Sequence, residues 1–159
     1  MQRTNQKLLV VFTILVLGLI CAPNTVGQKT TPAKVSSPMA QSPLVTDYRG
    51  VTLGMTTAET VAKLGQPMSH ADDQDFFFMS DQESAQVAYD ASRRVKTISV
   101  DYFGGTGAPD YKNVVGADIQ TRPDGSLYKL VRHETQRFWV SYNRTAGPVV
   151  IVTVTIQKY

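Results

Sequence analysis

Two neighbouring segments of the sequence alternate apolar and polar residues, and this alternation constrains the fold more than any other feature. In ESAQVAYD (83–90) and in RVKTISVDYF (94–103) every second residue is apolar through most of the segment. Successive side chains of a β-strand point to opposite faces, so each segment predicts a strand with one apolar and one polar face. Such strands are typical of an antiparallel sheet that is covered on one side only. The shorter segment FFFM (76–79) predicts a third strand of this sheet.

A short helix over residues 57–64 is predicted just before these strands. Thr56 and Glu59 have the spacing of a capping box, in which each side chain accepts a hydrogen bond from the main chain of the other residue. Gly65 suits the left-handed conformation that commonly ends a helix, and Pro67 prevents the helix from continuing. A helix of two turns is not stable alone. We therefore expect it to pack against the apolar face of the sheet.

The same order of helix and strands recurs in the second half of the chain. Gly116 corresponds to Gly65 in this alignment, and Tyr142 corresponds to Tyr89. A chance similarity between short alternating segments is the alternative interpretation. The matched segments are VAKLGQPM (61–68) with KNVVGADI (112–119), AQVAYD (85–90) with FWVSYN (138–143), and KTISVDY (96–102) with VTVTIQK (152–158).

The alternation and the repeat together predict an α+β domain over residues 45–159. Its first half is residues 45–103 and its second half is residues 110–159. Each half is expected to be a short helix followed by a three-stranded antiparallel meander, and the helix of the second half is expected to be degenerate. The two units are expected to form one curved sheet with both helices on the same face.

The first 44 residues are not expected to belong to this domain. Residues 1–27 have the order of a secretory signal peptide, with a basic start, an apolar run of 15 residues from Leu8 to Ala22, and small residues at the end. About 20 apolar residues are needed to cross a bilayer, so cleavage after Gly27 is favoured over a retained anchor helix. Residues 28–44 contain three prolines among Ser, Thr, Lys and Gln, and this composition predicts a disordered tether.

Removal of the leader also changes the charge and the cysteine chemistry of the exported protein. Without Arg3 and Lys7 the chain retains 14 basic and 13 acidic residues, so no general attraction to nucleic acid or acidic membranes is expected. Cys21 is the only cysteine and lies in the leader. After cleavage at Gly27 no cysteine remains for a disulfide, a nucleophile or a metal site. The alternative is that Cys21 is lipidated, as in a bacterial lipoprotein.

The segment GVTLGMTTAETVAKLGQP, followed by three strands, resembles the SmpA/OmlA (BamE-like) family of outer-membrane lipoproteins. The duplicated arrangement is similar to the β-lactamase inhibitor protein fold, in which two such units form one curved sheet. The resemblance covers residues 50–103 directly and residues 110–159 through the internal repeat. It implies a binding or scaffolding role at the cell envelope rather than catalysis, and it does not name a partner. The matched elements of the family motif are Gly54, Thr56, Val61, Leu64, Gly65 and Pro67.

No set of catalytic or metal-binding residues is evident in the sequence. The loop from His70 to Asp75 is rich in carboxylates, but it lacks the turn glycine and the distal glutamate of a calcium-binding loop. His133 and Glu134 lack the second histidine of a metalloprotease motif. We therefore predict no cofactor and no enzymatic activity. A metal-dependent hydrolase that uses the loop 70–75 is kept as the alternative.

The polar face of the predicted sheet is the best candidate for a binding surface. If Tyr89 and Tyr142 point to the helices, alternation places Trp139 on the opposite side. Trp and Arg are favoured anchors of protein interfaces. The alternative is that Trp139 belongs to the core and the alternation is reversed. The predicted partner-binding residues are Trp139, Arg137, Ser141, Asp101, Ser99 and Thr153.

The sequence therefore predicts an exported, non-enzymatic binding or scaffolding module of the bacterial cell envelope. Its expected place is the periplasm or the periphery of the outer membrane, or it is secreted. The expected partner is another envelope or secreted protein, and no transmembrane segment is expected after signal cleavage. A purely structural envelope protein, whose tether contacts membrane or cell wall, is a further alternative.

Overall fold

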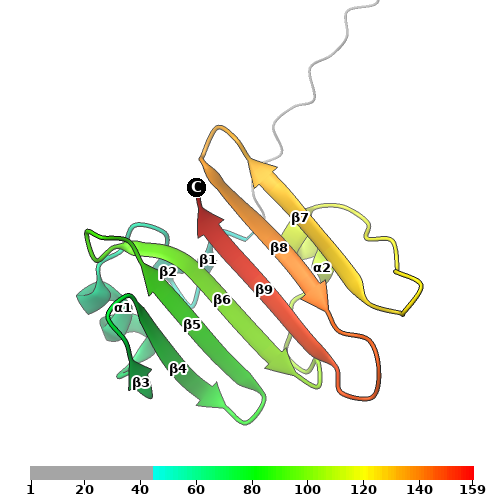
Figure 1. Ribbon diagram of the computed structural model, residues 1–159, viewed down its shortest axis with the longest axis horizontal. Helices are drawn as coiled ribbons and strands as arrows, with labels where there is room; N and C mark the ends of the chain where they lie inside the picture. Colours follow the sequence, from blue (N-terminus) through cyan, green and yellow to red (C-terminus); the bar gives the residue numbers. More distant parts are fainter. Residues whose placement is uncertain (1–44) are drawn as a thin grey trace, which may run out of the picture. The chain divides into compact units, whose positions relative to one another are not determined.

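Seven antiparallel strands form one sheet in the part of the chain that the computed structural model describes, residues 45–159 (Figure 1). The strand order is β3–β4–β5–β6–β9–β8–β7, and a separate short pair is formed by β1 and β2. The predicted signal peptide and tether lie outside the described residues. The elements are β1 (Asp47–Tyr48), β2 (Val51–Thr52), α1 (Thr57–Leu64), β3 (Ser69–His70), β4 (Gln74–Ser80), β5 (Glu83–Tyr89), β6 (Val95–Phe103), α2 (Tyr111–Val115), β7 (Leu127–His133), β8 (Phe138–Arg144) and β9 (Ile151–Lys158).

The predicted α+β class with tandem helices is wrong, because the described residues are mostly β. Strands hold 46% of them and the two helices hold 11%. The reason is that period-2 alternation runs through most of the domain, whereas helix-forming segments are short. In the second half the helix ends after five residues at Gly116. In α1 only Thr60 is fully buried, so the helices contribute little of the core.

Helix α1 begins and ends where the sequence predicts. The side chain of Thr56 accepts a hydrogen bond from the N–H of Glu59 (3.3 Å), and the Glu59 carboxylate accepts one from the N–H of Thr56 (2.7 Å). The capping box is therefore confirmed. The conformation of the glycine after the helix differs from the prediction: Gly65 has φ +89° and ψ −169°, which is not the left-handed helical conformation. Gly116 does have that conformation, with φ +67° and ψ +12°, so the two glycines end their helices differently.

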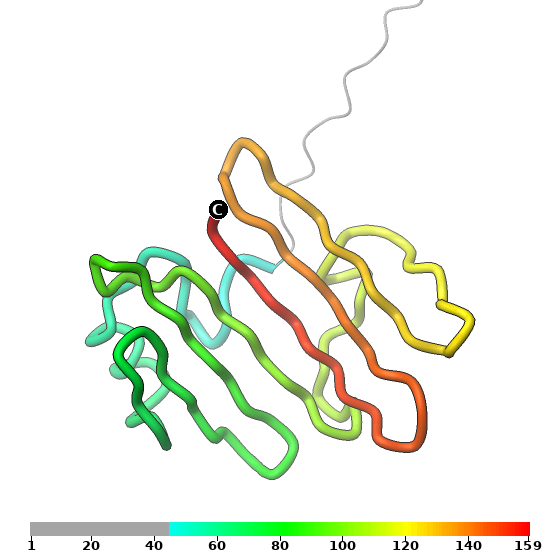
Figure 2. The backbone as a smooth tube through the Cα atoms, viewed as in Figure 1, coloured from blue at the N-terminus to red at the C-terminus, as the bar shows by residue number. Residues whose placement is uncertain are grey.

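Apart from the short strand β3, the order of the large sheet is symmetrical about the pair β6 and β9 (Figure 2). Ser99 pairs with Thr155 at the middle of these strands, in agreement with the predicted match of residues 96–102 with 152–158. The neighbouring strands β5 and β8 are shifted relative to the predicted match. The sequence alignment matches Val87 with Val140. In the structure, Val87 pairs with β6 at the position where Tyr142 pairs with β9, so the symmetry of the sheet relates Val87 to Tyr142 instead. A shift of two residues keeps every side chain on the same face of the sheet.

Two apolar clusters lie on one face of the sheet, called here the inner face. The first lies on β4, β5 and β6 and is covered by the segment around β1, β2 and α1; the second lies on β8 and β9 against α2. In Figure 1 both helices lie behind the sheet, on this face. The buried residues are Tyr48, Val51, Phe77, Ala85, Val87, Tyr89, Val95, Ile98 and Val100 in the first cluster, and Val114, Val115, Phe138, Val140, Tyr142, Val152, Val154 and Ile156 in the second.

Candidate recognition surface

The opposite face of the sheet, called here the outer face, has no element of the described chain packed over it (Figure 1). The strand registers order its side chains in rows that cross six strands, from β4 to β7. One row is Phe78, Ser84, Asp101, Thr153, Asn143 and Tyr128, and the next row is Phe76, Gln86, Ser99, Thr155, Ser141 and Leu130.

Five of the six predicted binding residues lie on the outer face. Ser99 and Ser141 share one row, and Asp101 and Thr153 are neighbours in the other. Trp139 lies in a third row, between Arg132 of β7 and Gln157 of β9. Its side chain is half-buried and does not belong to either apolar cluster.

Arg137 is not on the outer face. It lies in the turn between β7 and β8, where it is exposed and has φ +58°. Its carbonyl accepts a hydrogen bond from the N–H of Tyr159 (3.2 Å). The prediction assumes that the alternation continues to residue 137, but β8 begins only at Phe138. Strand alternation therefore does not determine the direction of the Arg137 side chain.

The centre of the outer face is polar and is linked by hydrogen bonds between side chains of β6 and β9. The Thr153 hydroxyl donates to the Asp101 carboxylate (2.6 Å), and the hydroxyls of Ser99 and Thr155 are 3.0 Å apart. Asp101 is the only charged residue of the two rows. A carboxylate has several acceptor sites, so Asp101 retains acceptor capacity for a donor of a bound molecule.

Aromatic side chains lie at the two edges of this polar centre. Phe78 is 55% exposed at the β4 edge, and Tyr128 is 44% exposed at the β7 edge. The guanidinium of Arg122 lies 5.0 Å from the centre of the Tyr128 ring. Aromatic side chains are enriched in protein interfaces, although they usually lie at the centre of an interface and polar groups at its rim, which is the reverse of the order on this face.

The acidic loop is organised differently from the sequence prediction. Asp75 belongs to β4 and is completely buried on the inner face. Its carboxylate accepts a hydrogen bond from the Tyr89 hydroxyl (2.6 Å) and pairs with Nδ1 of His70, whose side chain is 54% exposed. Burial and this hydrogen bond raise the pKa of Tyr89. Asp72 and Asp73 are exposed in the loop between β3 and β4.

The residues that a metal-dependent hydrolase would use are spread over the described chain. Within residues 45–159 no three His, Cys, Asp or Glu side chains are grouped closely enough to hold a metal ion. No serine, threonine or cysteine side chain of the described chain hydrogen-bonds to His70. The other histidine, His133, lies in β7 and stacks on Phe138 with ring centres 4.8 Å apart, and burial lowers its pKa.

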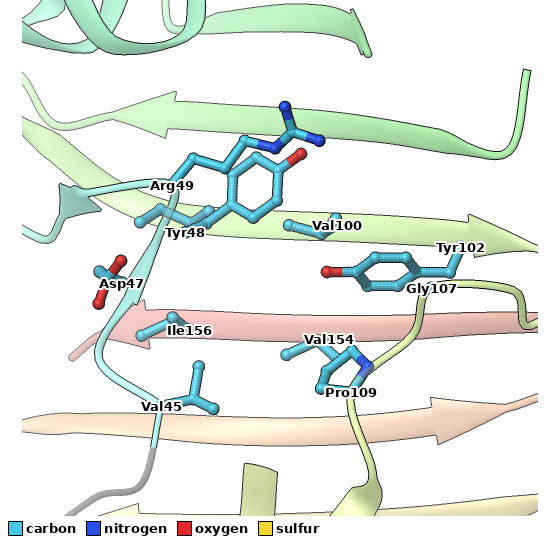
Figure 3. A pocket seen from close by; sticks show the side chains of 11 residues that line it. Val45, Asp47, Tyr48, Arg49, Val100, Tyr102, Gly107, Pro109, Val154 and Ile156 are labelled. Atoms are coloured by element: carbon cyan, nitrogen blue, oxygen red, sulfur yellow. The ribbon is translucent and has the colours of Figure 1, made fainter. Parts of the chain in front are cut away.

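A pocket of about 260 Å³ lies on the inner face, where the two apolar clusters meet over β6 and β9 (Figure 3). The segment 45–49 forms one wall and the segment 107–109 forms another. The hydroxyl of Tyr102 points into the pocket, and burial raises the pKa of this residue. Tyr48 donates to Glu83 (2.8 Å), which also pairs with Arg49 (2.6 Å). The pocket is smaller than most small-molecule sites, and no pattern in the sequence predicts it.

Comparison of the chain with known protein families, with characterised proteins and with solved structures found no match. The likeness to the SmpA/OmlA family therefore rests on the motif residues alone. Among residues 45–159 there is no helix with the length and apolar composition needed to cross a bilayer.

Proposed function

We propose that the protein is an exported, non-enzymatic module of the bacterial cell envelope that binds a protein partner on the outer face of its sheet. The observation that supports this function best is the outer face itself, which carries a largely half-buried polar centre, two exposed aromatic edges and a half-buried tryptophan. The leader sequence and the likeness to BamE-like lipoproteins support the envelope location.

Trp139 and Asp101 are proposed to be the main contacts of the partner. Trp139 supplies a large, rigid apolar surface of the kind that dominates protein interfaces. Asp101 supplies a carboxylate for a Lys, Arg or hydroxyl donor, because Thr153 satisfies only part of its acceptor capacity. Arg137 has a secondary place in this proposal, since it lies in the turn beside the face rather than on it.

The test is capture of the partner from an envelope extract, followed by measurement of its affinity for variants. We expect Trp139→Ala to weaken binding by about 30-fold, equivalent to a hot-spot loss of ~2 kcal/mol. The thermal midpoint should change little, because Trp139 belongs to neither apolar cluster. Val149→Ala is the matched control, since Val149 is an exposed apolar residue in the turn between β8 and β9. Unchanged affinity of the Trp139 variant, or a large fall in its midpoint, contradicts the proposal.

A metal-dependent hydrolase at the loop 70–75 is the weaker candidate, because its one buried carboxylate already binds His70 and Tyr89. A ligand that binds only the folded state raises the thermal midpoint. A clear rise with calcium, zinc or magnesium favours the hydrolase over the binding module. For a purely structural envelope protein, fractionation should place the chain with the membrane or cell wall, and no protein partner should be captured.

A further inference from the structure

The two edges of the large sheet are protected to different degrees. At one edge, β4 is partly covered by β3, and its pairing with β5 is interrupted by a register shift near Phe78. At the other edge, β7 pairs with β8 over seven residues without a shift, contains no proline, and has no further strand beside it within the described residues. Natural sheets usually cover or distort such an edge, because its free main-chain groups bind other strands.

The hydrogen bonds of β8 show which of its residues bond to β9. The N–H of Tyr159 donates to the carbonyl of Arg137 (3.2 Å), and the N–H of Thr145 donates to the carbonyl of Ile151 (3.0 Å). In an antiparallel pair, hydrogen-bonded positions alternate along the strand. The odd-numbered residues of β8 therefore bond to β9, and the even-numbered ones bond to β7.

The same alternation identifies the free groups of β7. Its odd-numbered residues lie opposite the even-numbered residues of β8 and bond to them. Tyr128, Leu130 and Arg132 are the even-numbered residues between them, and their N–H and C=O groups are directed away from β8. Each of these three residues also presents its side chain on the outer face. The free edge thus offers six main-chain groups in a regular array.

We propose that β7 is a self-association edge, at which two copies of this chain pair antiparallel about a two-fold axis at Leu130. In this register Leu130 lies opposite Leu130 of the second copy, and Tyr128 lies opposite Arg132 of the second copy. The Tyr128 ring already accepts the guanidinium of Arg122 at 5.0 Å, and Arg132 already lies 5.6 Å from the ring of Tyr159. Both side chains are therefore suited to a cation–π pair across the axis.

Like charges do not face each other directly in this register. Lys129 lies opposite the uncharged Val131 of the second copy. Residues that lie opposite each other in an antiparallel pair point to the same face. The outer faces of the two copies consequently join into one surface. The pairing does not depend on whether that surface binds a partner.

The experiment is sedimentation analysis of the purified protein over a range of concentrations. We expect a reversible equilibrium between monomer and dimer in the unaltered protein. Leu130→Lys and Leu130→Glu should each weaken dimerisation by about fivefold or more, because each places like charges opposite each other at the axis. An equimolar mixture of the two variants should form a heterodimer, since the charges at the axis are then opposite. Val149→Lys is the control, and its dimerisation should match that of the unaltered protein.

Three results overturn the proposal. The first is an unaltered protein that stays monomeric at every concentration. The second is a dimer that both Leu130 variants leave unchanged, because the axis then lies elsewhere. The third is a mixture of the two variants that forms no heterodimer. A monomer that instead binds an extended acidic peptide at β7, detected as loss of exchange at the amide of Leu130, assigns the edge to a different partner.

Discussion

At the scale of single residues, Asp75 has the most unusual environment in the described chain. A buried carboxylate is costly unless hydrogen-bond donors surround it. Two side chains do so here: the Tyr89 hydroxyl donates to one oxygen, and the His70 ring pairs with the other. These three residues join β3, β4 and β5, so the cluster fixes the short edge strand β3 to the sheet.

Replacing Asp75 tests whether this cluster stabilises the fold. Asp75→Ala should lower the free energy of unfolding by about 3 kcal/mol, because it removes the carboxylate to which the buried Tyr89 hydroxyl donates. Asp75→Asn should cost about 1 kcal/mol, since the amide oxygen still accepts from Tyr89. Urea unfolding measures both values. Asp72→Ala in the exposed loop is the control, expected within about 0.5 kcal/mol of the unaltered protein. Equal losses for Asp75→Ala and Asp72→Ala contradict the role of the cluster.

At the scale of secondary-structure elements, the two helices end by different means. Helix α1 has eight residues and a capping box, and helix α2 has five residues after the capping residue Asp110. Both helices end at a glycine whose N–H bonds to a carbonyl four residues earlier, at 2.9 Å in each case. The glycines nevertheless differ in ψ, so the chain leaves the two helices in different directions.

This difference predicts unequal costs for substitution of the two glycines. No atom lies within 4 Å of a Cβ added at Gly65, so the cost there is conformational only. Gly65→Ala should cost about 2 kcal/mol, because the combination of φ +89° and ψ −169° is accessible essentially to glycine alone. Gly116→Ala should cost about 1 kcal/mol, and Gly116→Asn still less, because asparagine tolerates the left-handed conformation. Thermal unfolding distinguishes them, and an equal or smaller loss at Gly65 contradicts its geometry.

At the scale of the whole molecule, one sheet carries two apolar clusters, and both contain tyrosines. Tyr48 and Tyr89 belong to the first cluster and Tyr142 to the second. Burial raises the pKa of all three, and hydrogen bonds to carboxylates raise it further for Tyr48 and Tyr89. The folded protein therefore keeps these phenols protonated at a pH where the unfolded chain ionises them.

The protein should consequently lose stability in alkali. A folded pKa above the unfolded value of 10 gives stability that is complete below pH 10 and is lost as the pH rises further. Each tyrosine that stays protonated contributes a slope of about 1.4 kcal/mol per pH unit, so three contribute about 4 kcal/mol per unit. Urea unfolding between neutral pH and strong alkali measures this slope. Tyr142→Phe should reduce the slope by about 1.4 kcal/mol per pH unit, and an unchanged slope contradicts the assignment.

The sequence by itself determined the features that depend on residues close together in the chain. Thr56 and Glu59 form their capping box, and the alternation in β5 and β6 separates an apolar face from a polar one. Trp139 and Asp101 lie on the polar face for the same reason. Hydrogen bonds over three residues and the period of a strand are local, so neighbouring residues suffice to predict them.

Only the tertiary structure decided the features that depend on residues distant in sequence. The sequence predicts that Asp75 belongs to a solvated loop, whereas in the structure it is buried and bonded to His70 and Tyr89. The fold class was mispredicted because the strands hold 46% of the described residues and the helices only 11%, and this proportion depends on how many segments join the one sheet. The free edge of β7 likewise exists only because strand order leaves it last in the sheet. Packing and strand order depend on the free energy of the whole domain, so they cannot be predicted from a local sequence pattern.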